Sequence, residues 1–142
     1  MPEAPRPYPR PDRDTGPFWG AQQHHELHLQ RCSGCAAFRF PVTPLCPECR
    51  SFDFEWAPCS GRGKVYSYTV VHHQTHPAFP VPYTIVLVEL EEGQRLIGQL
   101  RGSSDGLAIG APVGVEWEDA PNQPLPVWVI EGDSPPTPQV SE

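Results

Sequence analysis

Short apolar stretches separated by turn-forming residues recur along the second half of this chain, a pattern typical of short β-strands. The pattern predicts five strands, at Lys64–His72, Tyr83–Leu90 with its continuous apolar centre, Arg95–Leu100, Val113–Glu118 and Val127–Ile130. Glu92-Gly93 adds a turn signal between the second and third of them. Five short strands joined by turns predict a small barrel of the OB-fold type over residues 61–131.

The pattern before residue 61 predicts shorter elements. Residues 27–29 alternate and lead into Cys32 as a short strand, and residues 52–56 alternate aromatic with acidic side chains as another. Because each of these strands is brief, this half of the chain needs an additional source of folding energy.

A short helix is predicted between the N-terminus and the first strand. Asp14 or Thr15 can cap it, and the helix then runs through Phe18 and Trp19 to about His25. A helix of this length is unstable alone, so its aromatic side chains must pack on something. Phe18 and Trp19 are therefore candidate partner-binding residues, unless they fill a groove between the two halves of the chain.

Composition supports a mainly β fold and divides the chain into four parts. Pro and Gly account for 20 and 12 of the 142 residues, which excludes a long helical bundle. Residues 1–14 alternate Pro with charge and predict a disordered or extended arm. The helix and the first strands occupy residues 15–60, the barrel residues 61–131, and a disordered tail residues 132–142.

Charge argues against a role on nucleic acid or membranes. The formal net charge is −7, and residues 65–142 hold ten acidic side chains against two arginines. Such a barrel repels phosphates, although OB-folds as a class bind single-stranded nucleic acid, which stays the alternative function. No apolar run approaches the roughly 20 residues of a membrane span, so we expect a cytoplasmic protein.

Four of the five cysteines form two CxxC pairs, Cys32/Cys35 and Cys46/Cys49. In a reducing compartment this spacing indicates metal binding rather than disulfides or redox pairs. Four thiolates would hold one structural Zn²⁺ in a closed tetrahedral site, and the same sulfurs also suit iron. Cys59 has no paired base nearby in the sequence, so we expect it to be neither a ligand nor a nucleophile.

Other apparent motifs lack the spacing that their chemistry needs. In the segment His24-His25-Glu26-Leu27-His28, the glutamate follows a histidine but the next histidine is three residues from His25, not four as in HExxH. Gly61-Arg62-Gly63 has no following Lys-Ser/Thr of a phosphate-binding loop. No catalytic residue is predicted for this chain.

The motifs follow one another in an order that resembles a known family. Its elements here are Pro17-Phe18-Trp19, the CxxC pair in Leu29–Cys35, the second in Pro44–Cys49, Gly61–Val70, Pro82–Leu90 with its Glu92-Gly93 turn, and Ile109–Val113. This order resembles the acyl-CoA-associated family that joins a rubredoxin-like zinc ribbon to an OB-fold, catalogued as domain of unknown function 35. The resemblance covers residues 15–131.

The resemblance implies an accessory subunit rather than a free enzyme. Family members pair with thiolase-superfamily enzymes, either thiolases or lipid-transfer-protein aldolases of steroid or aromatic side-chain breakdown, and help bind acyl-CoA. Catalytic residues then belong to the partner within a hetero-oligomer. Because CoA carries phosphates and the ribbon half holds most of the arginines, the candidate acyl-CoA contacts are Phe38, Arg39, Phe40, Arg50 and Arg62.

Overall fold

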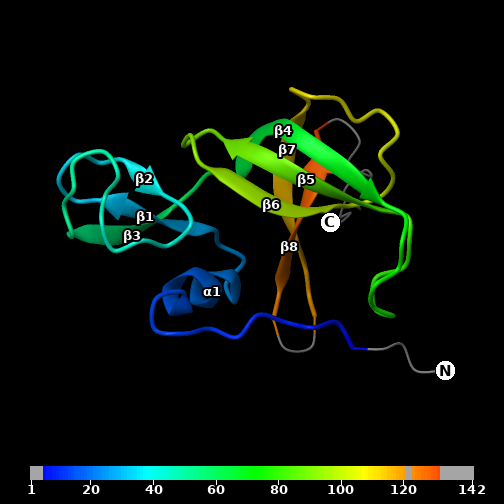
Figure 1. Cartoon of the computed structure of the whole chain (residues 1–142), viewed down its shortest axis with the longest axis horizontal. Helices are drawn as coiled ribbons and strands as arrows, with labels where there is room; N and C mark the ends of the chain where they lie inside the picture. The colour runs from blue at the N-terminus through cyan, green and yellow to red at the C-terminus, as the bar shows by residue number, and fades with distance from the viewer. Residues whose placement is uncertain (1–4, 121–122, 132–142) are drawn as a thin grey trace, which may run out of the picture.

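The computed structural model describes residues 5–120 and 123–131 as one short helix and eight strands. The helix α1 spans Gly16–Gln22. The strands are β1 His28–Cys32, β2 Phe38–Arg39, β3 Phe54–Pro58, β4 Arg62–Val71, β5 Tyr83–Leu90, β6 Arg95–Leu100, β7 Pro112–Glu118 and β8 Leu125–Ile130. Figure 1 shows the first three strands as one lobe, the other five as a second lobe, and α1 below the junction.

The first lobe is a small antiparallel sheet with the order β2-β1-β3. Its central strand pairs with β2 through Gln30 opposite Arg39 and with β3 through Cys32 opposite Phe54. The first CxxC pair therefore begins at Cys32, the last residue of β1. Strand β2 was not predicted, because two residues are too few to show an alternation.

The second lobe is a closed barrel with the strand order β4-β5-β6-β8-β7. All its pairings are antiparallel except that of β6 with β8, which is parallel. A bulge between Val65 and Ser67 changes the register of β4 against β5, as barrel closure requires. The five strands confirm the predicted OB-fold, with β5 and β6 at their predicted bounds.

One apolar core runs through both lobes. The barrel interior is filled by aliphatic residues around Trp128, which is 1% exposed. Phe18 from α1, together with Leu27 and Leu29 around the start of β1, belongs to the same cluster of buried residues. The ribbon lobe is therefore held against the barrel by shared apolar burial, not only by the connecting segment.

Helix α1 ends at Gln22, three residues before its predicted end. The chain turns there, because His25 has a φ of 59° and the Glu26 N–H donates to the Ala21 carbonyl at 3.1 Å. Its start is also organised differently from the prediction, since Thr15 makes no side-chain cap hydrogen bond. Instead, the Asp12 carboxylate accepts from the N–H groups of Asp14 and Thr15.

The segment before α1 crosses the barrel (Figure 1). Arg6 donates to Gln99 at 3.1 Å and to Glu118 at 3.4 Å, and its guanidinium lies 5.0 Å from the Phe79 ring centre. Residues 5–11 hold no helix or strand. The predicted tail at 132–142 lies outside the described residues. Within those, no helix is long and apolar enough to cross a membrane.

Candidate metal centre and neighbouring surfaces

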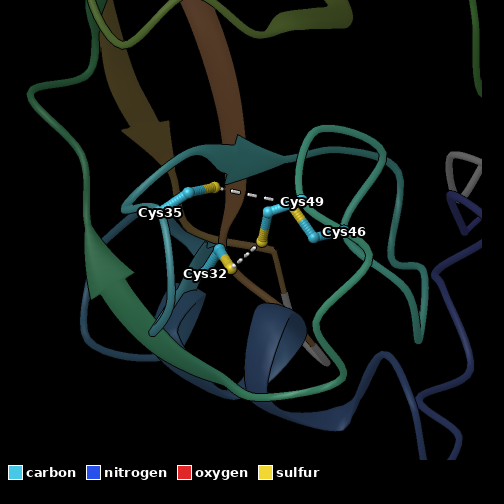
Figure 2. Close-up of side chains that lie close together, drawn as sticks. All are labelled: Cys32, Cys35, Cys46 and Cys49. Carbon is cyan, nitrogen blue, oxygen red and sulfur yellow. Dashed lines mark hydrogen bonds between the residues drawn. The ribbon is translucent and has the colours of Figure 1, made fainter.

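Two loops of the ribbon bring the four predicted sulfurs together. Cys32 ends β1 and Cys35 follows it, while Cys46 and Cys49 lie on the loop between β2 and β3. All four Sγ atoms lie within 4.8 Å of one another, with Cys32–Cys49 at 3.5 Å and Cys35–Cys46 at 3.6 Å (Figure 2). A Zn²⁺ ion bonded at about 2.3 Å places tetrahedral sulfurs about 3.8 Å apart, so the site fits one zinc.

The two CxxC turns share the same backbone geometry. In the first, the Ala36 N–H donates to the Cys32 carbonyl at 2.9 Å, and in the second the Arg50 N–H donates to the Cys46 carbonyl at 2.9 Å. Ala36 and Arg50 both have positive φ, 65° and 66°. A left-handed residue after each pair folds the chain back, so both turns direct their sulfurs at one centre.

Backbone amides also prepare the sulfurs for a cation. The Cys35 N–H lowers the pKa of Cys32 to about 6, and the Cys49 N–H is the largest of the effects that lower the pKa of Cys46. The pKa of Cys35 is raised to about 12: the Ala37 N–H lowers it, but burial and the neighbouring sulfurs raise it by more. Four thiolates at this spacing repel one another, so a divalent cation is what allows all four to ionise.

Arg39 belongs to the scaffold of the ribbon and is removed from the candidate acyl-CoA contacts. Its side chain is 2% exposed and donates to four backbone carbonyls at 3.2–3.4 Å. These carbonyls are those of Thr43, Pro44, Ser51 and Asp53. The guanidinium thus ties the segment entering the second CxxC turn to the segment leaving it. A side chain used in this way has no surface left for a phosphate.

Phe18 and Trp19, the candidate partner-binding pair, are placed differently from each other. Phe18 is 8% exposed and its ring centre lies 4.8 Å from that of Trp19 and 5.7 Å from that of Phe40. Phe18 therefore fills the groove between the lobes, which corrects its proposed role as a surface anchor. Trp19 is only half-buried, and its carbonyl accepts from Gln123 at 3.2 Å.

The remaining candidate acyl-CoA residues do not converge on one point. Phe38 and Phe40 line a cleft of about 760 Å³ between the ribbon and the β5–β6 turn, together with Glu48 and Glu92. Arg50 is exposed on the second CxxC turn. Arg62 starts β4 as an exposed side chain, and its Nε lies 3.5 Å from the Glu91 carboxylate.

Sequence reasoning missed a second cleft, between α1 and the barrel. It is lined mainly by apolar residues, together with Thr15 and with Gln22, a buried residue of α1. A glutamine on a short helix resembles an ordinary solvent-facing residue, so the sequence holds no signal for it. Cys59, by contrast, is placed as expected, outside the group of four cysteines.

Comparison with known families agrees with both lobes. The model of the ChsH2 rubredoxin-like zinc ribbon domain matches residues 19–55, and that of the ChsH2 C-terminal OB-fold domain matches residues 56–118. The chain is 45% identical over 129 residues to a probable enoyl-CoA hydratase alpha subunit of Thermomonospora curvata, covering 89% of this chain and 40% of that protein. The chain thus spans about two fifths of such a hydratase subunit.

Shorter relatives and a solved structure match the two-lobed unit itself. A DUF35 domain-containing scaffold protein of Methanothermobacter thermautotrophicus is 35% identical, covering 64% of this chain and 71% of its own. The benzoylsuccinyl-CoA thiolase subunit BbsA of Geobacter metallireducens is 37% identical, covering 53% of this chain and 50% of its own. A chain of the Ltp2-ChsH2(DUF35) aldolase superposes with a TM-score of 0.81 at 43% identity, covering 87% of this chain and 98% of that one.

The four clustered cysteines, the closed barrel and the matches to both lobes agree on one assignment. The four-cysteine site is that of a rubredoxin-like ribbon with one structural zinc. This chain belongs to the ChsH2-type DUF35 family, which joins a zinc ribbon to an OB-fold.

Proposed function

We propose that this chain is a non-catalytic subunit that holds a thiolase-superfamily enzyme in an acyl-CoA-processing complex. The observation that carries the proposal is the match to the DUF35 chain of an Ltp2 aldolase, which extends over 98% of that chain. The name of BbsA, a subunit of a thiolase, supports the same kind of partner. The reaction of the complex is then a thiolase or retro-aldolase step on an acyl-CoA thioester, in steroid or aromatic side-chain breakdown.

The chemistry of the described residues supports a scaffold. Four protein sulfurs complete the coordination of a zinc ion, so no position remains for water or substrate. Burial, and then the Glu92 charge, raise the pKa of Cys59 to about 12, so this thiol is not a nucleophile at neutral pH. The catalytic groups are therefore expected on the partner.

The acyl-CoA role rests on the exposed arginines of the ribbon side. Arg50 and Arg62 present guanidinium groups that suit CoA phosphates, and Phe38 and Phe40 line the cleft next to the ribbon. The carboxylates of Glu48 and Glu92, which also line that cleft, repel phosphates. We therefore place the phosphates at the arginines and the pantetheine arm towards the aromatic side of the cleft.

The experiment is co-expression with a thiolase-superfamily protein from the same genome, followed by size-exclusion chromatography and calorimetry with a non-hydrolysable acyl-CoA. Each of Arg50→Ala and Arg62→Ala should weaken acyl-CoA binding by more than about tenfold, since a charge-assisted contact contributes roughly 1.5–3 kcal/mol. Arg95→Ala is the matched control, because Arg95, like Arg62, is an exposed arginine that pairs with a glutamate, in its case Glu89 of β5 at 3.2 Å.

Separate results would contradict separate parts of the proposal. Failure of the two chains to co-elute would remove the scaffold function. A stable complex in which all three arginine variants bind acyl-CoA within twofold of the wild type would leave the scaffold but remove the CoA contact. Salt-sensitive binding of single-stranded DNA by the free chain would instead favour the alternative function.

A further inference from the structure

The cleft between α1 and the barrel exists because two strands separate there. β6 and β8 pair only through Gln99–Val127 and Leu100–Trp128, so the first residues of β6 leave the β8 edge. Helix α1 lies across the opening, and a cleft of about 240 Å³ remains. Its walls come from α1, the ribbon, β6 and β8, and they are almost entirely apolar. At its rim stands Ile97, 74% exposed.

Two polar residues line this apolar wall, Thr15 and Gln22, and the Thr15 hydroxyl already donates to the Asp12 carboxylate at 2.9 Å. The Gln22 side chain is 1% exposed, and neither its amide oxygen nor its amide nitrogen has a hydrogen-bond partner among the described residues. Leaving both atoms unpaired in a buried place is costly, whereas a leucine of similar size would fit without that cost. The unpaired amide therefore points to a group from outside that enters the cleft and pairs with it.

The size and chemistry of the cleft identify that group. Pockets for drug-sized molecules measure about 300–1,000 Å³, so 240 Å³ is small for a ligand but sufficient for one large side chain. A tyrosine offers an apolar ring for the walls and a hydroxyl that donates to the Gln22 Oε1 and accepts from its Nε2. Amphipathic aromatic side chains are also the commonest anchors of protein interfaces.

Charge favours a different protein over a second copy of this chain. Residues 65–142 carry ten acidic side chains and two arginines, so two barrels facing each other repel. Asp119, which follows β7, is exposed on the α1 side of the barrel, where its carboxylate lies 3.0 Å from the His25 Nε2. The neighbouring Glu118 is shared between Arg6 and Arg101 at 3.4 and 3.6 Å. A partner segment with basic residues beside its aromatic anchor complements this surface.

We propose that the cleft between α1, β6 and β8 is the anchor pocket for the thiolase-like subunit, which inserts a tyrosine side chain that hydrogen-bonds Gln22. This inference rests on the proposed function for the identity of the partner. The pocket itself is tested independently of it.

The first experiment uses the zinc-loaded free chain and p-cresol, the side-chain analogue of tyrosine. Methyl NMR signals of Ile97 should shift with p-cresol in the millimolar range, whereas those of Ile109, 65% exposed elsewhere on the barrel, should not. Toluene, the phenylalanine analogue, should bind about tenfold more weakly, and Gln22→Leu should remove this preference. Equal shifts at both isoleucines, or no preference for p-cresol, would overturn the proposal.

The second experiment measures affinity for the thiolase-like subunit. Ile97→Asp should weaken the complex at least tenfold and Ile109→Asp less than twofold. Gln22→Leu should weaken the complex about tenfold while leaving the melting temperature of the free chain unchanged or higher, because the unpaired atoms are gone. A lower melting temperature with an unchanged affinity would give Gln22 a structural role and refute its part in docking.

The two experiments separate the inference from the proposed function. If the complex forms and neither Ile97→Asp nor Gln22→Leu changes its affinity, the scaffold function stands and the anchor pocket is overturned. Selective p-cresol binding without any complex keeps the pocket and removes the thiolase-like partner. Shifts of Ile97 by a free acyl-CoA that displaces p-cresol would show a ligand site in place of a docking site.

Discussion

Arg39 provides the sharpest test of how the ribbon is held together. Replacing it with methionine keeps much of the volume but removes every hydrogen bond to the four carbonyls at 3.2–3.4 Å. It also removes the guanidinium that lies 5.2 Å from the Phe54 ring centre. The two ends of the second CxxC turn then lose their common tie, and the Pro44 carbonyl loses its donor. The carbonyls of Thr43, Ser51 and Asp53 each keep a second donor within the ribbon.

The magnitude follows from the burial of the group. Hydrogen bonds from a charged donor contribute about 1.5–3 kcal/mol each, but burying the ion opposes their sum. Because the acceptors are neutral carbonyls and three of them keep another donor, no uncompensated charge remains, and the net loss should be about 1.5–3 kcal/mol. Because zinc binding and ribbon folding are coupled, this loss should appear as a roughly 10- to 100-fold weaker zinc affinity.

The assay is competition for zinc with a fluorescent chelator at pH 7, beside urea unfolding followed by circular dichroism. Arg39→Lys should reduce the free energy of zinc binding about half as much as Arg39→Met does, because a lysine has three hydrogen-bond donors but lacks the planar guanidinium fork. Arg31→Met is the control, since Arg31 is an exposed residue of the same sheet and should change stability by less than about 0.5 kcal/mol. If Arg39→Met holds zinc within threefold of the wild type, the structural role assigned to Arg39 is wrong.

Three further outcomes test other parts of the structure. Cys46→Ser should abolish stoichiometric zinc by elemental analysis, while the strand signal of the barrel persists; full metal retention would exclude a four-sulfur site. Cys59 should resist thiol reagents in the native state, because burial raises its pKa from 9.0 to about 12, and rapid labelling of the native protein would contradict its burial. The thiol of the unfolded chain ionises at lower pH than that of the folded chain, so the free energy of unfolding should fall as the pH rises above 9. Gly98→Ala should cost about 1–3 kcal/mol in urea unfolding, because the new Cβ would lie 2.5 Å from the Trp128 Nε1; an unchanged midpoint would show that the indole moves at no cost.

Local pattern was sufficient for the barrel strands and the metal centre, but not for β2. The continuous apolar centre of β5 and the Glu92-Gly93 turn signal before β6 placed both strands at their bounds, and one face of each strand lies in the barrel core. The four ligands were evident from CxxC spacing, because two residues between cysteines suffice to bring their sulfurs together. Helix α1 was recognised but predicted too long, since the left-handed turn at His25 has no glycine to mark it.

What the tertiary structure decided is the role of individual side chains within those elements. Arg39 and Arg50 are both ribbon arginines in the sequence, yet one is buried on four carbonyls and the other is exposed. Which of the two is free depends on how the loop between β2 and β3 folds back over Arg39, with contacts 4 to 14 residues away, and no local period encodes that.

The clefts depend on even longer separations. Gln23, which follows α1, donates to Gln123 at 2.6 Å across 100 residues of chain, and the pocket beside them forms only when α1 meets the gap between β6 and β8. Sequence alone determined the five barrel strands and the cysteines of the metal site, because those properties arise from neighbours along the chain. The burial of Phe18, the unpaired amide of Gln22 and the face left for a partner arise from packing between segments far apart, which only the folded barrel and ribbon together define.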